Sequence, residues 1–249
     1  MTTSFRLDGR HAVVAGASGG IGAATALAFA SAGAATLTLV ARARAALEDV
    51  AAAARRLGAD VRVAPCDVTD EAAVDATFGG IDALDVLVYA AGANVPQALD
   101  EVELDTADRL WALNVRGALH CTREAVRRMP ESGGAIVLVS SQMGHVGAPR
   151  RSVYCATKHA VEGLTRALAV ELAPRGVRVV SIAPTFVATE MTAPFLADRR
   201  FRDDVLERIP LGRLATVEEV AAAALFAASP AAGSTTGCSL LVDGGWTAQ

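Results

Sequence analysis

The sequence predicts an α/β fold in which a doubly wound, parallel, seven-stranded sheet carries helices on both faces. Short apolar runs alternate with longer alanine-rich helical patterns along the whole chain, which is the order typical of parallel sheets. The first run leads into a glycine-rich turn and then a helix, a connection that opens many folds of this kind. Hydrophobic residues make up 52% of the 249 residues, and many are alanines, which fits helices packed closely over a sheet.

Seven apolar runs are the predicted strands, at residues 11–15, 36–41, 61–65, 84–89, 135–139, 177–183 and 238–242. Helical patterns fill the intervals, from the glycine turn to about Ser31, over 43–57, shortly after residue 66, over 104–129 and 154–172, and after Thr216. Either Thr69 or Asp70 is expected as the N-cap of the third helix. Thr216 and Glu219 have the spacing of a capping box.

No linker, repeat or charge run divides the chain, so residues 1–249 are interpreted as a single domain. The net charge of −4 does not suggest a nucleic-acid surface. The first eight residues lack the hydrophobic region of a signal peptide, and no apolar run is long enough to cross a bilayer. We therefore expect a cytoplasmic protein with reduced thiols and no membrane partner. The cysteines and histidines are scattered, so no metal site is expected; they are Cys66, Cys121, Cys155, Cys238, His11, His120, His145 and His159.

The glycines at positions 16, 20 and 22 predict a dinucleotide site. Glycine lets the backbone approach a pyrophosphate, and the helix that follows presents its N-terminus to the phosphates. The turn contributes Gly16, Ser18, Gly20, Ile21 and Gly22 as candidate cofactor-binding residues. The glycine spacing differs from the longer-chain fingerprint, and a plain strand-to-helix connection is the alternative interpretation.

Arg42 follows the second predicted strand, at the position where an acidic residue would bind the adenosine ribose. A carboxylate repels a 2′-phosphate, whereas a guanidinium grips it in a bidentate manner. We therefore favour NADP(H), with NAD(H) as the alternative; Arg42 and nearby Arg44 would otherwise only solvate the start of the next helix. Asp67, at the end of the third strand, is a candidate to meet the adenine amino group. Ala90 and Gly92 follow the fourth strand and would let a cofactor lie against the backbone.

Tyr154 and Lys158 stand four residues apart in a helical pattern, which places them on one face of the helix. An ammonium beside a phenol lowers the phenol's pKa, so the pair suits proton exchange with a carbonyl or alcohol oxygen. Ser141 follows the strand at 135–139, where its hydroxyl can point into the ligand crevice of a parallel sheet. Lys158 is the only lysine in the chain. The spacing alone is also compatible with a chance pair.

Asn114 lies within an apolar stripe of the 104–129 helix. The stripe consists of Ala107, Trp111, Ala118, Cys121 and Ala125. A buried amide must find partners, so Asn114 either pins the helix or holds a water near the reacting groups. A break in the regular helix is expected near Asn114, helped by Gly117.

The segment 185–214 is irregular, with short helical pieces and mixed apolar and charged residues, and is predicted to be a lid over the substrate. Three arginines in it are either a basic rim for an acyl-carrier partner or a solvated face, and the solvated face is favoured. They are Arg199, Arg200 and Arg202.

Taken together and in order, these motifs resemble those of the short-chain dehydrogenase/reductase family, of the short single-domain type. The resemblance covers essentially the whole chain and implies a Rossmann-type fold. It rests on the glycine turn, Asp67-Val68, Asn114-Val115, Ser141, the Tyr154 and Lys158 pair, and Asp243-Gly244-Gly245. The separation of thirteen residues between Ser141 and Tyr154 also matches the family.

The resemblance implies hydride transfer between NADP(H) and a ketone or secondary alcohol. Tyr154 would exchange the proton, and Lys158 would lower its pKa and hold the nicotinamide ribose. Ser141 would bind the reacting oxygen, and Asn114 would anchor a water for proton relay. Further cofactor contacts are implied for Val68, Pro184, Val187 and Thr189, with the last two at the carboxamide. Substrate contacts are implied for Ser141, Gln142, His145, Val146 and Tyr154.

The family also implies a homotetramer, and similar bacterial members reduce 3-oxoacyl thioesters, sugars or sugar acids, and cyclic ketones. Departures from its pattern spare the four catalytic positions and bear on packing and cofactor affinity. They are Ala15 for Thr, Tyr89-Ala90-Ala91-Gly92 for Asn-Asn-Ala-Gly, Val180 for Asn, and Thr185 for Gly. A non-catalytic NAD(P)-binding sensor or scaffold is the second hypothesis, and it predicts a damaged catalytic set. A bare interaction protein is the third, and the glycine turn and Arg42 argue against it.

Overall fold

The computed structural model describes residues 4–249 and contains the predicted sheet, in the order β3-β2-β1-β4-β5-β6-β7 with every pair parallel. Residues 1–3, part of the stretch in which no signal peptide was expected, lie outside this description. The strands are β1 (His11–Ala15), β2 (Thr36–Ala41), β3 (Asp60–Pro65), β4 (Val86–Tyr89), β5 (Gly134–Val139), β6 (Val177–Pro184) and β7 (Ser239–Val242). The strand order reverses between β1 and β4, which places a ligand crevice at the carboxyl ends of these strands.

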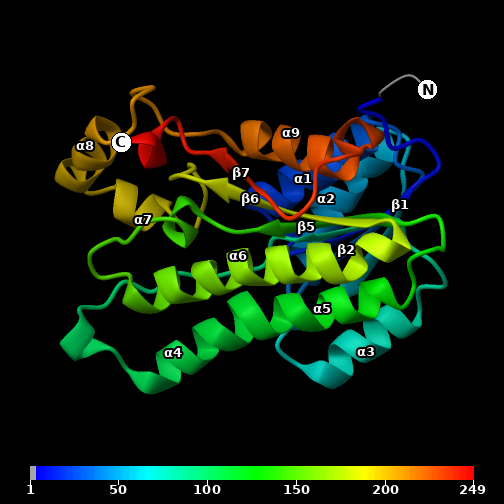
Figure 1. Cartoon of the computed structure of the whole chain (residues 1–249), viewed down its shortest axis with the longest axis horizontal. Coiled ribbons are helices and arrows are strands. Elements are labelled where there is room, and N and C mark those ends of the chain that lie inside the picture. Colours follow the sequence, from blue (N-terminus) through cyan, green and yellow to red (C-terminus); the bar gives the residue numbers. More distant parts are fainter. Residues whose placement is uncertain (1–3) are drawn as a thin grey trace.

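Helices cover the sheet in two layers (Figure 1). The helices are α1 (Gly20–Ser31), α2 (Arg44–Arg56), α3 (Glu71–Gly79), α4 (Leu104–Trp111), α5 (Gly117–Val126), α6 (Ser152–Leu172), α7 (Ala193–Leu196), α8 (Arg199–Glu207) and α9 (Val217–Ala228). One buried cluster joins α1, α2 and α9 to the sheet, and a second joins α3, α5 and α6 to its other face. The short α7 and α8 gather with the C-terminus at one end of the sheet, within the irregular segment predicted for 185–214 (Figure 1).

Side-chain caps explain several helix boundaries. Asp70 is the N-cap of α3, because its Oδ1 accepts hydrogen bonds from the amides of Ala72 and Ala73. Thr216 and Glu219 form the predicted capping box of α9. The largest differences from the predicted boundaries are that β4 begins at Val86 rather than residue 84, α5 ends at Val126 rather than 129, and α6 begins two residues before Tyr154.

The helix expected over 104–129 is interrupted at the predicted place by a π-helical turn, Ala112–Arg116. The wide turn frees backbone carbonyls, and the Tyr89 hydroxyl donates to that of Leu113 at 2.5 Å. Gly117 provides the necessary space, since a Cβ there would lie 2.5 Å from the Tyr89 hydroxyl. The π turn also changes the phase of the helix. Trp111, expected in the apolar stripe, is therefore 42% exposed, while the stripe residues of α5 are fully buried.

Within residues 4–249, no helix combines the length and apolarity needed to cross a membrane. All four cysteines are free thiols, as expected for scattered positions.

Arg178 of β6 provides a test of how the outer helical layer is attached. Its guanidinium donates to the carbonyls of Ala227, Ala228 and Ser229, at the C-terminus of α9. Cationic donors there satisfy carbonyls that the helix leaves unpaired. We expect Arg178→Met to lower the free energy of unfolding by about 1–3 kcal/mol, measured by urea denaturation. Arg175→Met removes a single exposed bond to Val126 and serves as the control. An equal effect of both variants would contradict the capping role.

Candidate active site

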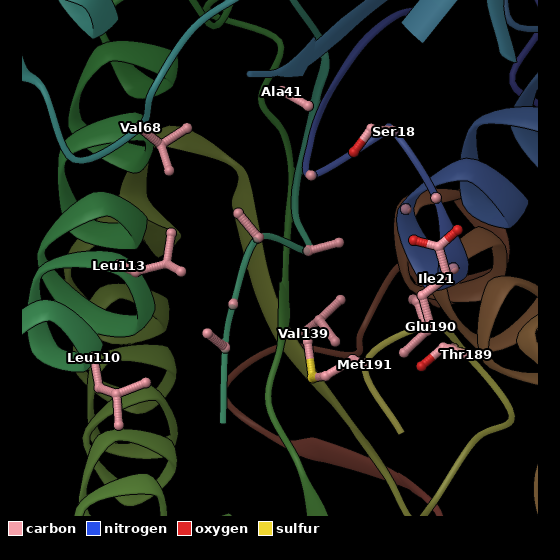
Figure 2. Close-up of a pocket in the computed structure, with 18 of the residues that line it drawn as sticks. Ser18, Ile21, Ala41, Val68, Leu110, Leu113, Val139, Thr189, Glu190 and Met191 are labelled. Atoms are coloured by element: carbon pink, nitrogen blue, oxygen red, sulfur yellow. The ribbon is translucent and has the colours of Figure 1, made fainter. Parts of the chain in front are cut away.

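A cavity of about 820 Å³ lies at the carboxyl ends of the central strands. Figure 2 shows its walls, with Ser18 and Ile21 from the glycine turn opposite Leu110 and Leu113. All fifteen positions predicted to bind the cofactor line this cavity, as does Ser141. They are Gly16, Ser18, Gly20, Ile21, Gly22, Arg42, Asp67, Val68, Ala90, Gly92, Tyr154, Lys158, Pro184, Val187 and Thr189. Residues from distant parts of the chain thus meet in a space of the size that small-molecule ligands occupy.

The glycine turn presents an open helix terminus to the cavity. Gly19 is the N-cap of α1 and provides no side-chain hydrogen bond, so the first amides of α1 have no capping partner. A Cβ at Gly22 would collide with the carbonyl oxygen of Gly16, so the turn packs this closely only with glycine. These residues fit a pyrophosphate, because amides at a helix N-terminus bind anions.

Arg42 is exposed at the end of β2 and lines the cavity. Among residues 4–249, no carboxylate oxygen lies within 4.0 Å of its guanidinium, whereas Arg44 pairs with Glu48 at 3.6 Å. The pKa of Asp67 is lowered by two hydrogen bonds from Thr69 and, to a smaller extent, by the charge of Arg42. Arg42 therefore offers its guanidinium to an anionic group at this end of the cavity.

Ser141 and Tyr154 meet at the other end. Ser141 begins a short turn, Gln142–Gly144, and its Oγ accepts a hydrogen bond from the Met143 amide at 3.1 Å. Burial raises the pKa of the Tyr154 phenol to about 12, while a hydrogen bond with Ser141 and the charge of the buried Arg151 act in the opposite direction. The phenol therefore carries its proton at neutral pH.

Lys158 is buried with 4% of its surface exposed, and its Nζ donates to the carbonyl of Val139 at 2.8 Å. The ammonium lies 5.6 Å from the centroid of the Tyr154 ring. Burial lowers the pKa of Lys158 to about 8, and the charge of Glu162 opposes this shift. Burial is the largest influence on the pKa of the phenol, and the charge of Arg151 opposes it. The lowering of this pKa by Lys158 stays a prediction.

Asn114 lies in the π turn, 1% exposed, with its amide fully engaged. Its Oδ1 accepts from the Ala93 amide at 2.9 Å, and its Nδ2 donates to the Ala93 carbonyl at 3.0 Å and to Thr157 Oγ1 at 3.1 Å. It does not line the cavity, but a Cβ placed on Gly92 would lie 3.2 Å from its Oδ1 and 3.7 Å from Lys158 Nζ. Asn114 therefore stands beside Lys158, behind the Gly92 backbone, and pins the loop after β4 to α6.

Three expected substrate residues lie outside the cavity lining. Gln142 is buried, and neither polar atom of its amide has a hydrogen-bond partner. The His145 ring points to Ser239 and Glu162. The next residue, Val146, is half-buried. Their role in substrate binding stays a prediction.

Other side chains line the cavity where sequence reasoning named none. They include Leu110, Leu113, Val139, Glu190 and Met191 (Figure 2). Three of these positions carried a signal that was available from the sequence: Leu113 precedes Asn114, and Glu190 and Met191 lie within the predicted lid.

Comparison with known proteins decides the family. A family model described as enoyl-(acyl carrier protein) reductase matches residues 16–247. D-threitol dehydrogenase of Mycolicibacterium smegmatis is 40% identical over 252 residues, covering 98% of this chain and 95% of that protein. Galactitol 2-dehydrogenase (L-tagatose-forming) of Cereibacter sphaeroides is 44% identical over 257 residues, covering 98% of both. The chain belongs to the short-chain dehydrogenase/reductase family.

A solved structure supports this assignment. Gluconate 5-dehydrogenase from Burkholderia cenocepacia J2315, in complex with NADP and tartrate, superimposes with a TM-score of 0.93 at 32% identity, covering 99% of this chain and 98% of that one. The predicted fold and the predicted class of enzyme are both confirmed: the protein is a short-chain dehydrogenase/reductase, an NAD(P)-dependent oxidoreductase that acts on CH–OH groups.

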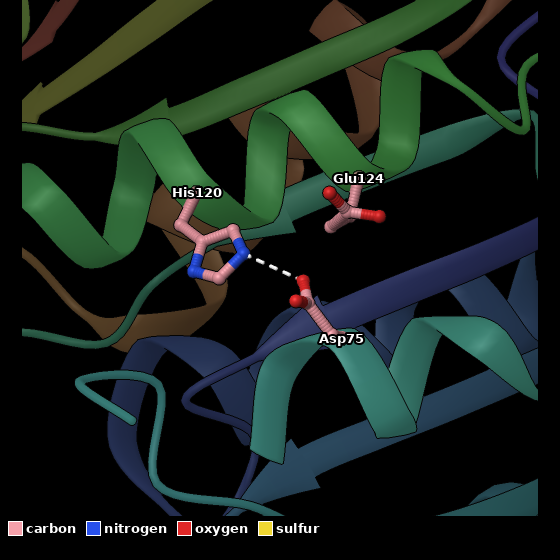
Figure 3. A group of neighbouring side chains, drawn as sticks. All are labelled: Asp75, His120 and Glu124. Atoms are coloured by element: carbon pink, nitrogen blue, oxygen red, sulfur yellow. Dashed lines mark hydrogen bonds and ion pairs between the residues drawn. The ribbon is translucent and has the colours of Figure 1, made fainter. Parts of the chain in front are cut away.

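One cluster outside the cavity resembles a metal site. Ligand atoms of Asp75, His120 and Glu124 lie within 4.8 Å of one another (Figure 3). However, His120 Nε2 is hydrogen-bonded to Asp75 at 2.9 Å, and the Glu124 carboxylate pairs with Arg127 at 2.7 Å and Arg128 at 2.9 Å. These contacts account for the cluster as a set of ion pairs and hydrogen bonds that join α3 to α5.

The pinning role of Asn114 can be measured as stability. Asn114→Ala leaves the Ala93 amide and carbonyl without their side-chain partners in a partly buried loop. We expect the free energy of unfolding to fall by about 2–4 kcal/mol in urea titrations. Thr157→Val removes one of the three hydrogen bonds and should cost clearly less. A loss in Asn114→Ala no larger than in Thr157→Val would contradict the pinning role.

Proposed function

We propose that this short-chain dehydrogenase/reductase transfers a hydride between NADP(H) and a ketone or secondary alcohol, with polyols and the corresponding ketoses as its substrate class. One observation carries the proposal: a single cavity joins Ser141, Tyr154 and Lys158 to an uncapped helix N-terminus and Arg42. The substrate class is supported by relatives whose names specify D-threitol and galactitol dehydrogenation. A non-catalytic sensor would not need an intact proton-transfer set.

The nicotinamide cofactor, when bound, supplies or accepts the hydride. Tyr154 holds a proton at neutral pH because burial raises its pKa, so its hydroxyl is ready to protonate a carbonyl oxygen during reduction. Ser141 hydrogen-bonds the same oxygen and orients it. Lys158 uses one donor on Val139, which leaves two for the nicotinamide ribose. The Tyr154, Ser141 and Lys158 side chains thus orient the reactants and control the proton.

Two further roles are proposed for residues near this centre. Asn114 sits beside Lys158 and anchors the backbone past which a relay water would pass. Val187, buried and bridged to Ala215, and Thr189 at the cavity wall would meet the carboxamide. Gln142, His145 and Val146 remain candidates for substrate contact once the site closes.

We propose that residues 185–214 act as the lid. Glu190 and Met191 from this segment face the cavity (Figure 2). The helices α7 and α8 follow them in the chain and lie at one end of the sheet (Figure 1). Arg199 is 94% exposed and lies 3.7 Å from Asp203 on α8. This arrangement supports a solvated face over a basic rim for an acyl-carrier partner.

We further propose a cytoplasmic homotetramer with no nucleic-acid or membrane partner. Large apolar side chains stand exposed on α4, α5 and α6, which form one layer of the molecule (Figure 1). They include Leu104, Trp111, Leu119 and Val170, and contact between copies would cover them. Four free thiols suit a reducing compartment.

Tyr154→Phe tests the proton donor. Removing the hydroxyl should lower kcat for NADPH-dependent reduction of a ketose by about 10²–10⁴-fold, because general acid catalysis contributes that much. NADPH binding, followed by nicotinamide fluorescence, should change little. Undiminished turnover would show that another group donates the proton.

Arg42→Asp tests the coenzyme assignment. Replacing the guanidinium by a carboxylate should move the ratio of kcat/KM values from NADPH towards NADH by about 10- to 100-fold. Arg44→Asp is the matched control and should shift the ratio much less, since Arg44 already pairs with Glu48. If the ratio does not move in Arg42→Asp, the 2′-phosphate is bound elsewhere.

A further inference from the structure

Glu162 is a buried carboxylate on α6, one helical turn beyond Lys158, that no step described above uses. It is 2% exposed. Its side chain packs under the loop that carries Ser141, since a Cβ added at Gly144 would lie 3.1 Å from Glu162 Cγ. Among the described residues, no lysine or arginine lies within 4.0 Å of its oxygens. A buried charge without a close cation is costly to maintain, so its surroundings need an explanation.

Neutral hydroxyl groups from two strands hold the carboxylate in place. Ser181 Oγ of β6 lies 3.0 Å from Oε1 and 2.9 Å from Oε2, and Ser239 Oγ of β7 donates to Oε1 at 3.2 Å. His145, from the loop after Ser141, places Nε2 at 3.4 Å from Oε1 and 3.0 Å from Ser239 Oγ. Hydroxyl donors fix the position of an anion without cancelling its charge. These contacts hold the carboxylate between β6 and β7, with neither of its oxygens within 4.0 Å of Lys158 Nζ.

A nearby negative charge would stabilise the buried ammonium of Lys158. It is buried, no carboxylate oxygen within the described chain lies inside 4.0 Å of its Nζ, and its contact with β5 is a neutral carbonyl. Tyr154 on its own helix and Asn114 from the π turn are also uncharged at neutral pH. Residues four apart share a helix face, so Glu162 is the charge that acts on the ammonium, and it opposes the effect of burial.

We propose that Glu162 is a positioning residue of the active site, a fixed negative charge that keeps Lys158 protonated while Ser181 and Ser239 hold it off the ammonium. A direct salt bridge would occupy the donors of Nζ, whereas a carboxylate held at a distance leaves them free for the cofactor ribose. The inference rests on the proposed function for what Lys158 binds. His145 is the titratable group that faces Glu162, with Nε2 at 3.4 Å from Oε1.

The chain offers a direct measurement, because Lys158 is its only lysine. Protein made with 13C-labelled lysine gives one side-chain NMR signal, and its titration reports the pKa of Lys158 without assignment. In Glu162→Gln the pKa should fall by about one unit or more, since an opposite charge is removed from a buried amine. Glu171→Gln, an exposed acid on the same helix, is the control and should leave the titration unchanged. Glu162→Asp keeps the charge and should recover most of the shift.

Coenzyme binding gives the functional readout. Near pH 5, well below the Lys158 pKa expected in either protein, wild type and Glu162→Gln should bind NADPH alike. Near pH 8 the variant should bind NADPH several-fold more weakly than wild type, because its Lys158 has the lower pKa and is already largely deprotonated there. A Lys158 titration that superimposes in the two proteins, even with a lowered Tm, would overturn the proposal and leave Glu162 a structural residue.

A second variant keeps the proposal testable if the first does not fold. If Glu162→Gln does not fold, Ser239→Ala replaces it: the loss of one donor lets the carboxylate approach Nζ and should raise the Lys158 pKa. An unchanged titration in Ser239→Ala would also overturn the proposal. Failure of the proposed function is distinguishable, because a wild-type protein that neither binds NADPH nor reduces ketoses still yields the Lys158 titration.

Discussion

The active site depends on keeping one ammonium in the interior of the protein. Lys158 reaches the carboxyl end of β5 from α6 and donates to the Val139 carbonyl, a backbone group that the end of the strand leaves available. A guanidinium would need several acceptors in one plane, whereas an ammonium can share its donors between this carbonyl and a ligand. The position of the ammonium thus follows from where β5 ends, and the sheet fixes that end through its pairing with β4 and β6.

The π turn adapts the fold to this requirement. A continuous helix from α4 to α5 would point the Asn114 side chain in a different direction and would place its carbonyls in regular bonds. The wide turn lets Asn114 hold the loop after β4 against α6, so that Gly92 passes close to Lys158. Tyr89 stabilises the turn from the sheet by donating to Leu113. Gly117 provides the room that this phenol needs.

Periodic features were predictable from the sequence, and local geometry was not. The strands β1, β2, β4, β5 and β6 are buried almost throughout and form continuous apolar runs, which is why their limits agree with prediction to within a residue or two. The break in the helix near Asn114 was predictable, because a buried amide needs hydrogen-bond partners. The prediction that Trp111 lies in the buried stripe was wrong. The π turn shifts the helical phase of the residues around it, and no composition rule reveals such a shift. His145 points away from the cavity for a reason invisible in sequence order, because its partners Glu162 and Ser239 come from elements far along the chain.

The pKa values of Tyr154 and Lys158 depart most from the sequence-based expectation, and they determine which of the two groups titrates first. Burial shifts the two groups proposed to be catalytic in opposite directions, raising the pKa of Tyr154 to about 12 and lowering that of Lys158 to about 8. Divergent shifts of this kind separate the roles of paired groups. The phenol keeps its proton throughout the physiological range, so the group that changes charge first as pH rises is the ammonium. Control of the alkaline side of the reaction then belongs to whatever fixes the charge of Lys158, and in this fold that is a carboxylate one turn along the same helix.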